Sequence, residues 1–119
     1  MTTLTQDAPR RARDVVWYAA LVHRISGVLL ACFLPLHFLA LALALNGEAK
    51  LDGFLRWTEQ PLVEVAEGVL VFLLTVHLLG GLRLLLIEYG AVRPGRKELV
   101  ALAFGTAAIL ALAFYIGLV

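Results

Sequence analysis

Three histidines stand in stretches of sequence that are otherwise almost wholly apolar. His23 opens the segment HRISG, His37 follows fourteen residues later, and His77 opens the segment HLLGGLR. A neutral imidazole can bind a metal or haem iron through one ring nitrogen while the other nitrogen makes a hydrogen bond. Because a polar side chain in a hydrophobic span is costly, these three residues are the first candidates for chemistry.

Composition places the chain in a membrane. It has 119 residues, 61% of them hydrophobic, and a mean hydropathy of +0.89. Only 16% are charged, against roughly 25% in soluble domains. We predict a single membrane domain over residues 1–119, with a short polar segment at 1–16. A formal net charge of +1 gives no field that would attract nucleic acid.

Three stretches are long and apolar enough to span a bilayer. Residues 25–47 and 99–119 contain no charged residue, and residues 68–87 contain only Arg83. Each is near the roughly 20 residues that a membrane-spanning helix requires. We therefore predict an all-α membrane protein with three transmembrane helices, at about residues 18–46, 61–90 and 97–118.

Turn residues mark the ends of these helices. Asn46-Gly47 suits the end of the first helix, Pro61 suits the first turn of the second, and the Arg-Pro-Gly segment at 93–95 separates the second from the third. Pro35 lies inside the first helix and predicts a kink there. Cys32, the only cysteine, can form neither a disulfide framework nor a cysteine-based metal site.

Basic residues predict the orientation. The connection between the first two helices offers only Lys50 and Arg56. More positive charge flanks the first helix and the connection between the last two: Arg10, Arg11, Arg13, Arg24, Arg93, Arg96 and Lys97. The positive-inside rule then places the N-terminus in the cytoplasm and the C-terminus on the outer side. The N-terminal segment is too short and too acidic for a mitochondrial transit peptide, which favours a protein of the bacterial inner membrane or a mature chain.

His77 lies near the middle of the second predicted span. Gly81 stands one helical turn beyond it, and Gly80 widens the region of this helix face that has no side chain. A flat macrocycle such as haem could therefore lie against this face. Alternatively, the two glycines let another helix approach closely, and His77 forms a hydrogen bond with that helix. The residues alone leave both interpretations open.

Arg83 favours an anionic ligand near His77. It lies six residues further on, about 9 Å toward the cytoplasm. A guanidinium at that depth needs either an anion, such as a haem propionate, or a route to the lipid headgroups. Glu88 is a candidate ion-pair partner for Arg83 or for a basic residue of another subunit.

The first helix carries the other two histidines at different depths. His37 falls within about 40° of the stripe that contains His23, and about 21 Å from it along the helix axis. His23, Arg24 and Ser26 lie near the predicted cytoplasmic interface, where polar side chains cost little. His37 is deeper, so its presence asks for a stronger explanation.

Two of these motifs resemble a known family. HRISG at 23–27 is similar to the H-R-x-[ST]-G signature of the cytochrome b subunit of succinate dehydrogenase. His77, Gly81 and Arg83, followed by Glu-Tyr-Gly at 88–90, resemble the haem-ligand helix of the same family. In this order the motifs cover nearly the whole chain, which therefore resembles the C-type cytochrome b556 membrane anchor of succinate dehydrogenase or fumarate reductase, respiratory complex II.

The resemblance implies roles for particular residues. His77 would be an axial ligand to the iron of haem b, beside Gly81, and Arg83 and His23 would lie near the haem propionates. Arg24 would serve both the haem and a site for ubiquinone or menaquinone. That quinone site would also include Ser26 and Ala20, the latter standing where the best-studied branch of the family has a serine.

His37 has a separate counterpart in the resemblance. Members of the superfamily with two haems have a histidine about fourteen residues after the first-motif histidine, where it binds a second haem. His37 is therefore a candidate ligand for a second haem b. The alternative is a histidine that packs within the protein.

The resemblance also implies partners. The chain would be a subunit of succinate dehydrogenase (quinone) in the tricarboxylic acid cycle, with no catalytic residue for the dicarboxylate. An iron-sulfur subunit would pass electrons to its quinone site, next to a flavoprotein subunit and a second small membrane anchor that supplies the other axial histidine. Two alternatives are a haem-free quinone-site anchor of a related dicarboxylate dehydrogenase and an unrelated small membrane transporter or assembly protein.

Overall fold

Helices make up nearly all of the structure. A computed structural model describes residues 4–93 and 96–119, with side chains described from Asp14 onward. Its helices are α1 (Leu4–Ala42), the short 3-10 helix η1 (Leu43–Asn46), α2 (Glu48–Thr58), α3 (Pro61–Glu88) and α4 (Lys97–Tyr115). No strand occurs in the described residues. The side chains of Arg10, Arg11 and Arg13, and the pair Pro94-Gly95, lie outside the description.

Three of the helices are long and apolar enough to cross a membrane. They cover Asp14–Asn46, Pro61–Glu88 and Lys97–Tyr115. The prediction of an all-α membrane protein with three spans is confirmed, with bounds that agree to within a few residues. Together with these lengths, the hydropathy identifies the chain as a multi-pass membrane protein.

Most of the predicted helix ends also agree with the structure. Gly47, with φ of +108°, follows the last turn of η1 in a conformation that residues with a side chain rarely adopt. Pro61 occupies the first turn of α3, where its missing N–H costs nothing. At its other end α1 begins earlier than predicted, at Leu4, and it continues as a helix through Pro35.

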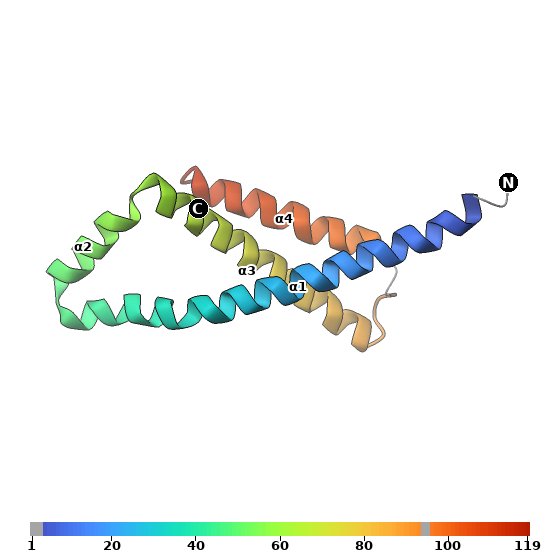
Figure 1. The fold of residues 1–119 in the computed structure, drawn as a ribbon, viewed down its shortest axis with the longest axis horizontal. Coiled ribbons are helices and arrows are strands. Elements are labelled where there is room, and N and C mark those ends of the chain that lie inside the picture. The colour runs from blue at the N-terminus through green and yellow to red at the C-terminus, as the bar shows by residue number, and fades with distance from the viewer. Residues whose placement is uncertain (1–3, 94–95) are drawn as a thin grey trace.

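The sequence analysis missed α2, which bridges the ends of α1 and α3 (Figure 1). Its charged residues made residues 48–58 resemble a polar connection. A helical signal is nevertheless present, since Leu51, Phe54 and Leu55 recur at a spacing of three and four. The connection between α1 and α3 is therefore an amphipathic helix.

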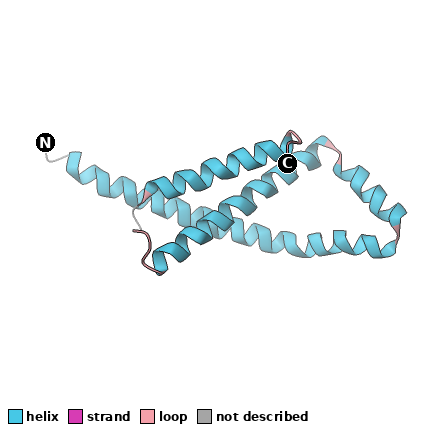
Figure 2. Cartoon of the chain, turned by 180° about the vertical axis from the view of Figure 1, so that it is seen from behind, coloured by secondary structure: helices cyan, strands magenta, loops and turns pink. Residues whose placement is uncertain are grey.

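The three spans pack in a simple order. α4 runs back along α3 over most of its length, and α1 crosses α3 (Figures 1 and 2). Small residues line the contact of α3 with α4: Gly68, Ala103 and Ala107 are buried. Small side chains allow helix backbones to approach closely, which is how helices associate where lipid removes the hydrophobic drive.

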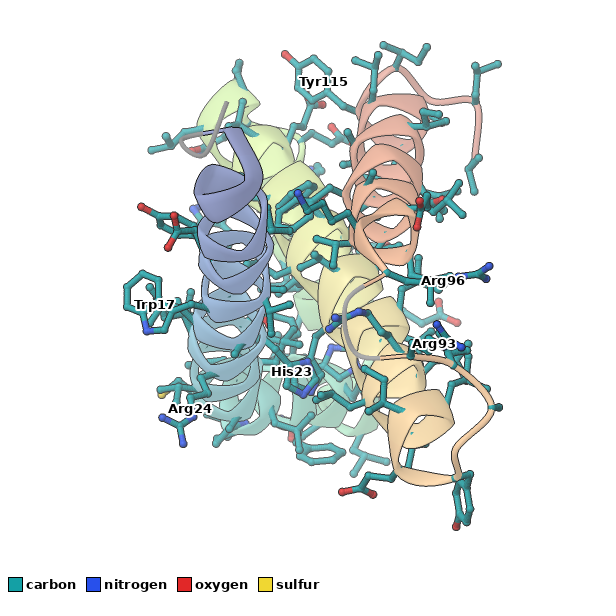
Figure 3. All side chains as sticks on the ribbon, turned by 90° about the vertical axis from the view of Figure 1, so that its right-hand side faces the viewer. Trp17, His23, Arg24, Arg93, Arg96 and Tyr115 are labelled. Carbon is teal, nitrogen blue, oxygen red and sulfur yellow. The ribbon has the colours of Figure 1, made fainter. Side chains whose placement is uncertain are left out.

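Arg93 and Arg96 lie at the same end of the bundle as the first turns of α1 (Figures 1 and 3). This grouping is what the positive-inside argument requires, because it gathers the basic residues on one side of the membrane. Which side that is stays a prediction.

Ala107 offers a test of the α3–α4 contact. Its side chain is fully buried, whereas that of neighbouring Ala108 is exposed. We expect Ala107→Leu to destabilise the protein by about 1–3 kcal/mol, because the larger side chain must force the two helices apart. Thermal unfolding of the purified protein in detergent would measure this. Ala108→Leu is the control, and equal melting temperatures for the two variants would contradict the packing described.

Candidate functional site

The crossing of α1 and α3 brings two of the three histidines together. The imidazole of His23 extends from α1 toward α3 (Figure 3) and stacks on the imidazole of His77. The ring centroids are 4.2 Å apart and the ring planes differ by 5°. Residues that the sequence placed in two separate motifs therefore form one site between two helices.

Glycines on each helix make room for the histidine of the other. A Cβ atom built on Gly27 would lie 2.9 Å from Cε1 of His77, closer than Cβ atoms approach other atoms in real structures. Cβ atoms on Gly80 and Gly81 would lie 3.1 Å from Nδ1 and 3.4 Å from Cε1 of His23. The interpretation in which Gly80 and Gly81 let another helix approach is confirmed, and the approaching helix is α1.

His77 is held by hydrogen bonds to α1 through one nitrogen. Its Nδ1 lies 3.1 Å from the main-chain oxygen of His23 and 3.2 Å from Oγ of Ser26. Ser26 is completely buried, and its hydroxyl donates to the same His23 oxygen at 2.9 Å. Both atoms that face Nδ1 are thus available as acceptors.

These contacts determine the tautomer of His77. A carbonyl oxygen can only accept, so Nδ1 must carry the hydrogen and donate it. In the neutral ring Nε2 then keeps its lone pair, and it makes no hydrogen bond among the described residues. A histidine that ligates a metal has this arrangement, with one N–H donated to a carbonyl and the other nitrogen free to bind.

A small cavity lies beside the histidine pair, between α1, α3 and α4. Its volume is about 70 Å³, and both His23 and Arg83 line it. Arg83 is only 8% exposed, and Nδ1 of His23 is buried without a hydrogen bond to any described residue. A buried cation beside a buried ring nitrogen that still lacks a partner is a site suited to an anionic or hydrogen-bonding group.

The cavity is too small for a large cofactor. Sites for drug-sized ligands are typically about 300–1,000 Å³, several times the volume found here. This cavity could therefore hold a small polar group of a ligand, but it could not enclose a whole haem or quinone.

The residues predicted for a quinone site do not share one face. Arg24 is exposed and extends away from the bundle (Figure 3), and Ala20, one turn before it, is also exposed. Ser26 is buried against His77 on the opposite side of α1, about 160° around the helix from Arg24. Arg24 and Ala20 are brought together, and Ser26 is separated from them.

His37 lies apart from the histidine pair. It is about 16 Å along α1 from Ser26, in the part of α1 that has diverged from α3 beyond the crossing (Figure 1). Its side chain is exposed and its ring lies beside Phe33, with centroids 5.4 Å apart. No polar group among the described residues satisfies this imidazole.

The sequence analysis missed the roles of two residues in the site. Gly27 leaves the space that the ring of His77 occupies, and Ser26 is a hydrogen-bond partner of His77. A signal for Gly27 was available. His23 and His77 are each followed by a glycine four residues later, so each helix carries a histidine and a space on one face. The same spacing on two helices allows each histidine to pack on the glycine of the other helix, once the helices cross at the level of these residues.

Comparison with protein families gives a match over most of the chain. The profile described as Succinate dehydrogenase/Fumarate reductase transmembrane subunit matches residues 10–114. Comparisons with curated proteins and with solved structures gave no match. The matched range contains the histidine pair, the glycines, Arg24, His37 and the cavity.

Gly27 allows the histidine contact to be tested directly. We expect Gly27→Ala to destabilise the protein by about 1–3 kcal/mol, because the new methyl group collides with the His77 ring and His77 must leave its hydrogen bonds to avoid it. Thermal unfolding in detergent would measure the loss. Gly105→Ala is the matched control, since that transmembrane glycine has open space around it. A Gly27→Ala protein as stable as the control would refute the contact.

Proposed function

The chain belongs to the succinate dehydrogenase/fumarate reductase transmembrane subunit family, and we propose that it is the member of its complex that binds haem b and helps to form the quinone site. The family indicates a membrane anchor subunit of an oxidoreductase complex. One observation supports the proposal most strongly. His77, in the middle of a membrane span, holds its Nδ1–H against a carbonyl, which leaves Nε2 available to an iron.

The residues around His77 suit a haem. The axial ligand would be His77, with its ring held by α1 and its tautomer set by the His23 carbonyl. A bound haem b would supply an iron that carries one electron at a time, at a potential set by its ligands and its surroundings. A second axial histidine would come from another subunit, because His23 is stacked on His77 rather than opposed to it.

Arg83 and His23 would receive the anionic edge of the haem. Both line the cavity beside His77, and the buried guanidinium of Arg83 would offset the charge of a propionate. A charge-assisted hydrogen bond of this kind is strong in a site from which water is excluded. Gly81, under the ring of His23, keeps that ring close to the backbone of α3.

Arg24 would form the wall of the quinone site. Its exposed side chain, with Ala20 one turn away, presents a cation on an outer surface of α1. A guanidinium there would donate hydrogen bonds to a quinone oxygen and stabilise the negative charge that develops on it. Ubiquinone and menaquinone both carry such oxygens.

The exposed surfaces support a complex of several subunits. Within the span of α1 only Ser26 is fully buried among the described side chains, so most of this helix is available to partners. We propose an iron-sulfur subunit that delivers electrons, a flavoprotein subunit that oxidises or forms the dicarboxylate, and a second small anchor. His37 is the proposed ligand of a second haem, and the bacterial inner membrane is the proposed location.

Haem content tests the axial ligand. We expect His77→Ala to abolish haem b in the purified complex, because the ring that binds the iron is removed. His37→Ala should leave one of two haems if the complex has two, and should change nothing if it has one. Pyridine haemochrome assay and reduced-minus-oxidised spectra would measure both variants. Full haem in the His77→Ala complex would show that a residue other than His77 binds the iron, and no haem in the unmodified complex would leave only a haem-free anchor.

Quinone reduction tests Arg24 separately. We expect Arg24→Gln to lower succinate:quinone activity by about tenfold or more, since a hydrogen bond from a charged donor contributes roughly 1.5–3 kcal/mol. Haem content should not change. Arg56→Gln serves as the control, because Arg56 is an exposed arginine on α2, at the far end of the spans. Unchanged activity in Arg24→Gln would place the quinone elsewhere.

A further inference from the structure

Ser26 is completely buried in a membrane helix, and its hydroxyl lies next to the side chain of His77. Its Oγ lies 3.2 Å from Nδ1 of His77 and 2.9 Å from the main-chain oxygen of His23. The exposed Arg24 lies on the opposite side of α1. Ser26 is therefore placed to act on His77 rather than on a ligand at the outer surface.

The His23 oxygen alone would hold Nδ1 only loosely in direction. A ring with a single acceptor can rotate about its Cβ–Cγ bond while it keeps a bent hydrogen bond. Oγ of Ser26 provides a second acceptor beside the first, so the N–H is shared between two oxygens. Gly27, the next residue, leaves the space that the ring fills. These contacts together fix the plane of the imidazole.

Ser26 also influences the basicity of the ring. Acceptors at one imidazole nitrogen raise the basicity of the other and thus strengthen its bond to a metal. The hydroxyl of Ser26 donates to the His23 oxygen, so the two acceptors are polarised as one chain. Loss of Oγ would remove one of the two acceptors at Nδ1 and leave the N–H less well directed.

We propose that Ser26 is the positioning residue for the haem ligand: together with the His23 carbonyl, which sets the tautomer, it fixes the ring plane of His77 and thereby sets the haem affinity and potential. This inference rests on the proposed function, since it assigns His77 to haem iron. It gives Ser26 a role in ligand geometry in place of a contact with quinone.

The test compares three variants in the purified complex. In Ser26→Ala we expect haem affinity to fall by about tenfold or more, and the midpoint potential of the haem to rise because a less basic ligand stabilises the ferric state less. Ser26→Thr keeps a hydroxyl and should restore both values. Thr75→Val is the control, because it removes a hydroxyl that bonds only to the Val71 oxygen of its own helix, two residues from His77.

A second measurement separates this inference from the proposed function. Nitrogen-15 chemical shifts of histidine-labelled full-length chain, prepared without haem, report the hydrogen bonding at Nδ1 of His77. We expect the Nδ1 shift to be the same in the unmodified chain and in Ser26→Thr, and to move in Ser26→Ala because one of the two acceptors is lost. This reading does not depend on whether the complex binds haem.

The outcomes are distinct. A midpoint potential and an Nδ1 chemical shift that are both unchanged in Ser26→Ala would overturn the role of Ser26 even if His77 is the axial ligand. A shift in Thr75→Val equal to that in Ser26→Ala would show a general effect of helix stability, which also refutes the inference. If the Ser26→Ala complex does not assemble, Ser26→Cys replaces it, since a thiol of similar size is a weaker acceptor and should raise the potential in the same direction.

Discussion

The rest of this site depends on the contact between α1 and α3 in which the histidine of each helix packs on a glycine of the other helix. Each helix contributes one imidazole and the absence of a side chain where the other imidazole lies. Lipid offers no hydrophobic drive to bring the helices together, so close packing and hydrogen bonds between them must do so. Here one arrangement supplies both, and it also directs the free nitrogen of His77.

The contacts that hold α1 against α3 are therefore the same contacts that orient the ring of His77. Polar groups in the middle of a span are tolerated when they satisfy one another, and Ser26, His77 and the His23 carbonyl do so. Nδ1 of His23, by contrast, is buried without a hydrogen bond to any described residue, in the cavity that Arg83 also lines.

Much of this could be predicted from the sequence. The lengths of the stretches without charged residues located the three spans. The position of His77 near the middle of the second span identified it as a polar residue that is costly to place in the membrane. The charged residues of α2 concealed an amphipathic helix of eleven residues. The stacking of His23 on His77 could not be predicted because it depends on the level and rotation at which two helices cross. The pattern of each helix specifies its own faces but not the register between them.

Ser26 illustrates the same limit within a single motif. Its place next to Arg24 in HRISG suggested a shared pocket, whereas a rotation of about 200° over two residues puts them on opposite sides of α1. Residues adjacent in a helical motif therefore serve different surfaces. In this chain one surface faces α3 and the other faces outward.

The two parts of α1 on either side of Ser26 differ in their support from this chain. The part before Ser26 lines the cavity together with α3 and α4, whereas no described side chain of α1 beyond Ser26 is fully buried. A tilt of α1 by about 10° about the level of Ser26 would move His37, about 16 Å away, by about 3 Å, while His77 would hardly move. The position of His37 is therefore more sensitive to the tilt of α1 than the position of His77.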